Sequence, residues 1–162
     1  MRRIATVLAA SAALCCAVAI AAADDRATCG STPPKSDAVN ACSRIIASPR
    51  TSPHDRALAF AFRADAKRAG GDAAGAIADY SQAIALLPDF ALAYRSRGTL
   101  YLKTGDNANA RADFDKAIGP DPQDAKALYG RGLARRASGD AAGGDADVAA
   151  ATKLDPNIAG KM

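Results

Sequence analysis

Few residues in this chain could perform chemistry, and the sequence does not bring them together. Its one histidine, His54, lies in a proline-rich stretch without a nucleophile, acid or base at a catalytic spacing. Motifs of serine hydrolases, P-loop nucleotide binders and zinc proteases do not occur. The Gly- and Asp-rich stretch 139–145 could suggest a phosphate cradle or calcium loop, but its place in a repeat assigns it to a turn and helix start. We therefore expect no catalytic, cofactor or metal site.

The cysteines are the other reactive residues. Cys15 and Cys16 lie in an amino-terminal segment typical of a secretory signal, so Cys29 and Cys42 remain after its removal. A redox pair or half of a metal site is an alternative, but the spacing is not C-x-x-C and no second ligand pair occurs. In an oxidising compartment the pair predicts a structural disulfide, worth about 3 kcal/mol for a loop of roughly 14 residues.

Residues 1–23 predict export. Arg2 and Arg3 precede an uncharged run at 4–20, and Ala21 and Ala23 form a small-residue cleavage site. The alternative is an uncleaved anchor, because the run approaches the roughly 20 residues that span a bilayer. We expect cleavage near Ala23, a periplasmic or secreted location, and no membrane contact of the mature chain.

Size and charge restrict the mature chain further. Removal of the signal leaves 139 residues, which is enough for one domain. It also leaves 19 basic and 17 acidic residues, so the net charge is small. A nucleic-acid-binding protein would concentrate basic residues on one face, and the sequence shows no such concentration.

A repeat of 34 residues organises the rest of the chain. Segments 57–90, 91–124 and 125–158 align Gly71 with Gly105 and Gly139, and Pro88 with Pro122 and Pro156. Each segment predicts a helical hairpin, with first helices at 57–69, 91–103 and 125–137 and second helices at 73–86, 108–118 and 141–154. One hairpin cannot bury its apolar face alone, so the hairpins are expected to stack into a curved solenoid.

The repeats resemble those of the tetratricopeptide repeat family over residues 57–158. The middle copy carries the family's aromatic, small and proline positions at Tyr94, Gly98, Tyr101, Ala110, Phe114, Ala117 and Pro122. Lys67 and Arg135 depart from the pattern, because an aromatic is usual there. The resemblance implies an all-α, right-handed α-solenoid of three hairpins, preceded by one capping helix.

Charged residues also recur at this period. Arg63, Arg97 and Arg131 each precede an aspartate by 16 residues, at Asp79, Asp113 and Asp147. The spacing predicts a ladder of ion pairs along the seam between helices. Independent, solvated charges are the alternative.

The family forms a concave groove from positions 2, 5, 9 and 12 of each first helix. Here these positions hold Leu58, Ala61, Asp65 and Arg68; Leu92, Arg95, Thr99 and Leu102; and Lys126, Tyr129, Leu133 and Arg136. The resemblance implies that this surface binds an extended or helical peptide with some acidic side chains. It does not imply the family's chaperone-tail clamp, because Ala61, Asp65, Ser96 and Gly130 do not match that clamp.

Both ends of the repeat array are atypical. Residues 24–56 form a lead segment with a capping helix at 36–47, a linker at 48–56, and a disulfide that fastens the irregular stretch 32–34. At the other end, Gly143 and Gly144 weaken the last helix and no further helix follows. We expect this helix to fray or to meet a partner, with a tail at 159–162.

The sequence therefore predicts a non-catalytic adaptor or scaffold of the cell envelope that holds a protein or peptide partner in its concave groove. Two alternatives remain open. The chain could be a self-associating structural protein, forming a homo-oligomer through its carboxyl end, or an accessory subunit of an envelope enzyme.

Overall fold

The computed structural model describes residues 24–30 and 35–161, so the expected signal at 1–23 and the stretch 31–34 lie outside the described residues. All regular elements in this described part are helical. Residues 24–30 form a short helix. It is followed by α2 (Lys35–Ala47), α3 (Pro53–Ala69), α4 (Ala73–Leu86), α5 (Ala91–Lys103), α6 (Asn107–Ile118), α7 (Ala125–Ala137), α8 (Ala141–Leu154) and the 3-10 helix η1 (Ile158–Lys161).

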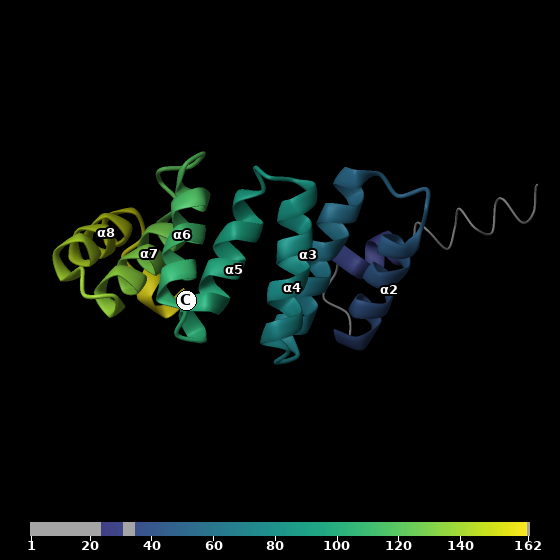
Figure 1. Cartoon of the computed structure of the whole chain (residues 1–162), viewed down its shortest axis with the longest axis horizontal. Helices are drawn as coiled ribbons and strands as arrows, with labels where there is room; N and C mark the ends of the chain where they lie inside the picture. Colours follow the sequence, from purple (N-terminus) through teal and green to yellow (C-terminus); the bar gives the residue numbers. More distant parts are fainter. Residues whose placement is uncertain (1–23, 31–34, 162) are drawn as a thin grey trace, which may run out of the picture.

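The helices stack in chain order into an elongated row (Figure 1). Helices α3 and α4, α5 and α6, and α7 and α8 pack as hairpins, and each hairpin leans on the next through α4 against α5 and α6 against α7. The carboxyl end does not continue this row but turns back against α7. The expected all-α solenoid is confirmed.

Local sequence fixes the turns inside the hairpins. Gly71, Gly105 and Gly139 have φ angles of 88°, 81° and 92°, in the left-handed region that a side chain disfavours. The aspartate after each glycine begins the second helix, as expected. Its carboxylate accepts a hydrogen bond from a free backbone N–H in the first turn of α4, α6 and α8.

One prediction about the lead segment is wrong. Helix α3 begins at Pro53 and not at residue 57, so part of the expected linker is helical. Ser52 caps this helix by accepting a hydrogen bond from the backbone N–H of Asp55. Pro53 occupies the first helical position, where a backbone N–H would have no acceptor within the helix, so proline costs no hydrogen bond there. Residues 24–30, for which the sequence predicts no particular structure, are helical, and Asp25 in this helix pairs with Arg44 of α2.

The disulfide between Cys29 and Cys42 is present, with the two Cα atoms 4.9 Å apart. It joins the helix at 24–30 to α2. Cys42 lies in one core cluster with Ala59 of α3, just as Tyr80 of α4 lies in one cluster with Ala93 of α5. The disulfide thus occupies the place that an aromatic ring fills between the following helices.

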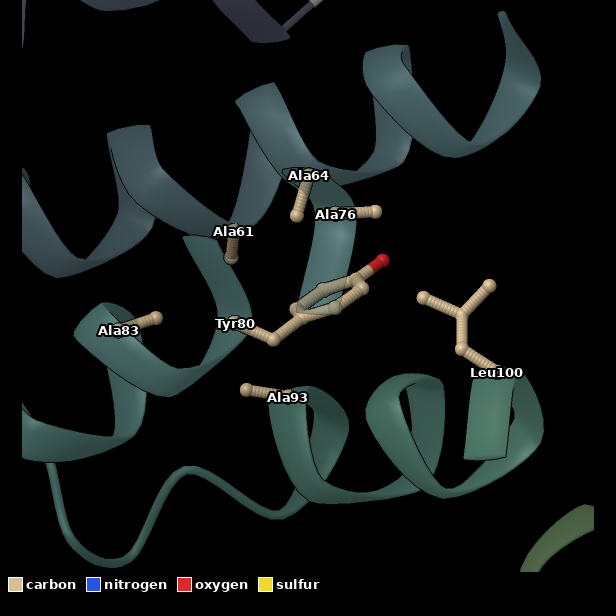
Figure 2. Packing of buried hydrophobic residues seen from close by; sticks show 7 residues of the cluster. All are labelled: Ala61, Ala64, Ala76, Tyr80, Ala83, Ala93 and Leu100. Atoms are coloured by element: carbon tan, nitrogen blue, oxygen red, sulfur yellow. The ribbon is translucent and has the colours of Figure 1, made fainter. Parts of the chain in front are cut away.

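Large side chains surrounded by alanines form the core. Figure 2 shows the ring of Tyr80 among small residues of α3, α4 and α5. Phe114 fills the same place in the next repeat and is fully buried. It leaves no room for a side chain at Gly130, where an added Cβ would lie 2.3 Å from the ring. The rings and the small residues therefore fix the spacing between hairpins.

The third hairpin has no aromatic in this position and closes by backbone approach instead. A Cβ on Gly144 would lie 2.7 Å from the carbonyl oxygen of Gly132, and one on Gly132 would lie 2.9 Å from that of Gly144. Gly144 lowers helix propensity, as expected, but its missing side chain is what lets α7 and α8 meet.

The predicted ion pairs all form. Each arginine of the ladder donates two hydrogen bonds to its aspartate, at 2.6–2.8 Å. The aspartates are the buried charged residues of the described chain, at 4% exposure for Asp79, 5% for Asp113 and 6% for Asp147. The alternative of independent, solvated charges is wrong.

Each of these arginines also reaches the preceding repeat. Arg63 Nη1 donates to Ser43 Oγ of α2 at 2.9 Å, and Arg97 Nη1 donates to Ser81 Oγ of α4 at 2.8 Å. Arg131 Nη1 makes the equivalent bond to Asp115 of α6 at 2.9 Å. One guanidinium therefore joins three consecutive helices.

The two departures from the family's aromatic pattern add to the ladder. Lys67 Nζ lies 2.8 Å from a carboxylate oxygen of Asp79, and Arg135 Nη1 lies 2.9 Å from one of Asp147. Burial alone would raise the pKa of Asp79, but the hydrogen bonds from Arg63 and Lys67 outweigh it and lower that pKa. The buried carboxylate therefore stays charged at neutral pH.

Replacement of Arg97 by methionine should strongly destabilise the fold, because the buried carboxylate of Asp113 would lose the guanidinium that binds it. We expect Arg97→Met to lower the free energy of unfolding by about 3–5 kcal/mol in a urea titration. Arg111→Met is the matched control, since Arg111 and Asp115 form an exposed pair at 4.0 Å, worth about 0–1 kcal/mol. Similar losses in the two variants would show that the ladder is not a stabilising feature.

Candidate functional site

A groove with a volume of about 350 Å³ opens along the first helices of the repeats. Helices α3, α5 and α7 form it together with η1. Its lining residues are Asp65, Arg68, Leu92, Arg95, Ser96, Thr99, Lys103, Lys126 and Lys161.

Positive charge dominates this groove, because five cationic side chains line it and Asp65 is the one carboxylate among the lining residues. Three of the cations have partners within the chain. Arg68 lies 3.0 Å from Asp65, Arg95 lies 2.7 Å from Asp124, and Lys161 lies 2.6 Å from Asp155.

Lys103 and Lys126 are the exposed cations of the groove that lack such a partner. Within residues 24–30 and 35–161, neither ammonium group forms an ion pair. Both side chains are therefore available to an anionic ligand.

Asp65 is held in place by its neighbours. Its Oδ1 accepts hydrogen bonds from the Tyr80 hydroxyl at 2.7 Å and from Arg68 Nη2 at 3.0 Å. Burial and this hydrogen bond to Asp65 raise the pKa of Tyr80 to about 12, so the hydroxyl remains a donor at neutral pH. The negative charge of Asp65 is thus directed toward two groups of the protein itself.

Arg95 has a structural role in addition to lining the groove. It pairs with Asp124, whose carboxylate caps α7 by accepting hydrogen bonds from the backbone N–H groups of Lys126 and Ala127. Replacement of Arg95 would therefore disturb the start of α7. Lys103 and Lys126 are better positions for testing the groove.

Helix η1 brings Lys161 into the groove, although the sequence places it in a tail. Ile158 is 1% exposed and packs in a cluster with Leu128 and Ala151, which fixes the chain against α7. Lys161 then reaches Asp155 across this turn. The prediction that nothing covers the carboxyl end is thus wrong in part, whereas fraying of α8 and self-association through this end stay predictions.

Six of the twelve groove residues expected from the repeat line the observed groove, while Ser96, Lys103 and Lys161 were missed. Ala61 is a wrong choice, because it is buried in the first core cluster. The other five expected residues do not line the groove. Leu58 lines two other hollows, and Leu102 and Tyr129 pack partly against core clusters. Leu133 is half-buried, and Arg136 pairs with Asp145.

His54 lies in an apolar hollow and not in a catalytic arrangement. The hollow has a volume of about 310 Å³ and is lined by His54, Leu58, Leu87, Pro88, Asp89 and Phe90. Over the described residues, no group of three or more His, Cys, Asp or Glu side chains is placed to hold a metal ion. No helix in that part of the chain has the length and apolar character needed to cross a membrane.

Comparison with known families agrees with this architecture. A model described as TPR repeat matches residues 64–105, and one described as tetratricopeptide repeat matches residues 91–124. The chain contains repeats of the tetratricopeptide (TPR) family. Comparison of this TPR protein with curated protein sequences gives no match.

Solved structures show the same fold. MamA from Desulfovibrio magneticus RS-1 superposes with a TM-score of 0.69 at 21% identity, over 76% of this chain and 67% of that one. The Arabidopsis OM64 TPR domain gives 0.63 at 26% identity, over 65% and 87%. The second TPR of Spaghetti (RPAP3), bound to the HSP90 peptide SRMEEVD, gives 0.59 at 28% identity, over 61% and 92%.

Truncation of Ile158 should loosen the turn that carries Lys161. We expect Ile158→Ala to lower the free energy of unfolding by about 2–5 kcal/mol, because it leaves a cavity against Leu128 and Ala151. The amide of Lys161 should also exchange faster with solvent. Asn157→Ala is the control, since Asn157 is exposed beside the same turn. Unchanged stability in Ile158→Ala would mean that η1 is not docked in solution.

Proposed function

We propose that this TPR protein is a non-catalytic adaptor whose groove binds an acidic segment of a partner protein. TPR repeats form interaction scaffolds, and this groove supplies a surface for one. The observation that carries the proposal is the charge of the lining, where five cations face one carboxylate and two of the lysines form no ion pair with any described residue.

The exposure of two groove lysines favours an acidic peptide over a neutral one as the ligand. Lys103 and Lys126 are exposed, so water solvates their charges in the free protein and their presence in the groove destabilises the fold little. A peptide carboxylate that reaches both would gain two charge-assisted hydrogen bonds. The groove would also attract such a peptide before contact, and this attraction would weaken as salt is added.

The proposed ligand differs from the peptide seen with RPAP3. That peptide, SRMEEVD, is acidic. An acidic ligand on a TPR protein of similar fold supports an acidic ligand for the cationic groove of this chain. This chain, however, has Ala61, Asp65, Ser96 and Gly130 where the chaperone-tail clamp needs other side chains. We therefore propose an acidic segment other than that chaperone tail.

We further propose that the protein works in the periplasm or outside the cell. The signal-like residues 1–23 support export, and the disulfide supports an oxidising compartment. Periplasmic fractionation of cells that produce the full chain, followed by mass measurement of the mature amino terminus, tests this location. A reduced, unprocessed chain in the cytoplasm would contradict it.

Reversal of the two lysine charges that form no ion pair should weaken binding of acidic peptides. We expect the double variant Lys103→Glu with Lys126→Glu to bind a fluorescent, glutamate-rich peptide at least about tenfold more weakly than the unaltered protein, because two attractions become repulsions. Fluorescence anisotropy at low and high salt measures the change.

The control reverses the same number of charges outside the groove. Lys116 in α6 and Lys153 in α8 are exposed and do not line it, so Lys116→Glu with Lys153→Glu should keep most of the affinity. Equal losses in the two double variants would indicate a general charge effect, and no binding by the unaltered protein would refute the proposed function.

A further inference from the structure

We propose that the same acidic partner segment places a large apolar side chain in a hollow beside Phe62, about three residues away from its first acidic residue. This inference rests on the proposed function, since it adds a specificity element to the ligand of the cationic groove. It assigns a role to the amino-terminal part of the concave surface.

The hollow has the size and lining for one apolar side chain. Its walls are Cys29, Ile45, Leu58, Ala59 and Phe62, and Arg26 and Asp55 form a polar rim with their nearest atoms 3.5 Å apart. Its volume of about 160 Å³ is close to the roughly 150 Å³ of an apolar cavity that admits benzene. A leucine or phenylalanine side chain therefore fits.

The disulfide maintains one wall of this hollow. Cys29 belongs to the helix at 24–30, and its bond to Cys42 holds that helix beside α2 and α3. At Gly30 an added Cβ would lie 3.9 Å from two ring atoms of Phe62, so the end of this helix lies close to the ring. Phe62 nevertheless remains 42% exposed.

Exposed apolar side chains are also present on helices that form the groove. The large ones among the described residues are Phe62, Leu92 and Leu154, and the first two lie on α3 and α5. Leu92 also lines the cationic groove itself. An apolar surface beside unpaired positive charge is complementary to a segment that carries both apolar and acidic side chains.

Helix α3 connects the hollow to the groove. Leu58, Phe62, Asp65 and Arg68 follow one another at intervals of four, three and three residues, so they form one stripe along this helix. The first two line the hollow, and the last two line the groove. A ligand lying along α3 would contact both.

The stripe also sets the spacing within the ligand. Phe62 and Arg68 are six residues apart, which corresponds to about 9 Å along a helix at roughly 1.5 Å per residue. An extended peptide rises about 3.3 Å per residue, so it covers this distance in about three residues. The apolar and the first acidic position should therefore be separated by about that number.

A second copy of this chain is a poorer occupant of the hollow. The remaining exposed large apolar residue in the described part, Leu154, lies between Lys153 and Asp155, and Asp155 is already paired with Lys161. Insertion of Leu154 would thus bring Lys153 toward the cationic groove. Positive charge on both sides opposes that contact.

Two synthetic peptides of equal charge test this inference. Both carry the same glutamate run, but one has leucine and the other serine three residues before it. We expect the unaltered protein to bind the leucine peptide about tenfold more tightly, because burial of one leucine side chain is worth roughly that factor. Moving the leucine so that it adjoins the glutamate run should remove most of this advantage.

Phe62→Ala then locates the contact. We expect it to remove the preference for leucine and to leave the affinity for the serine peptide unchanged, with thermal melting used to confirm that the variant is folded. Leu154→Ala is the matched control, since Leu154 is similarly exposed at 45% but lies on α8, and it should keep the preference.

The outcomes separate the two proposals. If Phe62→Ala keeps the leucine preference, or weakens both peptides equally, the apolar contact is wrong while the cationic groove stands. If the unaltered protein binds neither peptide, the proposed function fails, and the apolar contact fails with it. Higher affinity for the leucine peptide that does not depend on its spacing would also overturn the inference.

Discussion

The fold depends on arginine side chains inserted between helices. Each of Arg63, Arg97 and Arg131 binds a buried aspartate of its own hairpin and a polar oxygen of the preceding one. A buried carboxylate is costly unless it is paired, so the contacts are mutually dependent. They fix both the angle within a hairpin and the register between hairpins. The concave surface is therefore a consequence of buried charge pairs as well as of apolar packing.

Much of this fold could be predicted because its signals are local and recur. The bounds of α4, α5, α7 and α8 agree with the prediction because glycines with positive φ and prolines recur at fixed offsets, and an aspartate caps α4, α7 and α8. The ladder follows from the same period. The start of α3 in the lead segment was harder to predict, since a proline such as Pro53 can end a helix or begin one. The serine before it was the available signal for a start.

The site was less predictable, because its residues depend on contacts between distant segments. Periodicity correctly placed Arg68, Arg95 and Lys126 in one groove, yet it also selected Ala61, which the packing of α3 turns into the core. Lys161 could not be found from the repeat, since it lies outside it. Only the docking of Ile158 against α7 brings that lysine to the groove.

The arrangement explains how an almost neutral chain can present a cationic surface. The basic and acidic residues of the expected mature chain nearly balance, and by charge alone they suggest no particular ligand. In the structure, these charged residues occupy different environments. Asp79, Asp113 and Asp147 are buried in the ladder, where five cationic side chains pair with them, whereas Lys103 and Lys126 are exposed and form no ion pair within the described residues. The groove is therefore cationic because of where its lysines lie, and the carboxylates of a ligand would supply the counter-charge that the described chain does not pair with them.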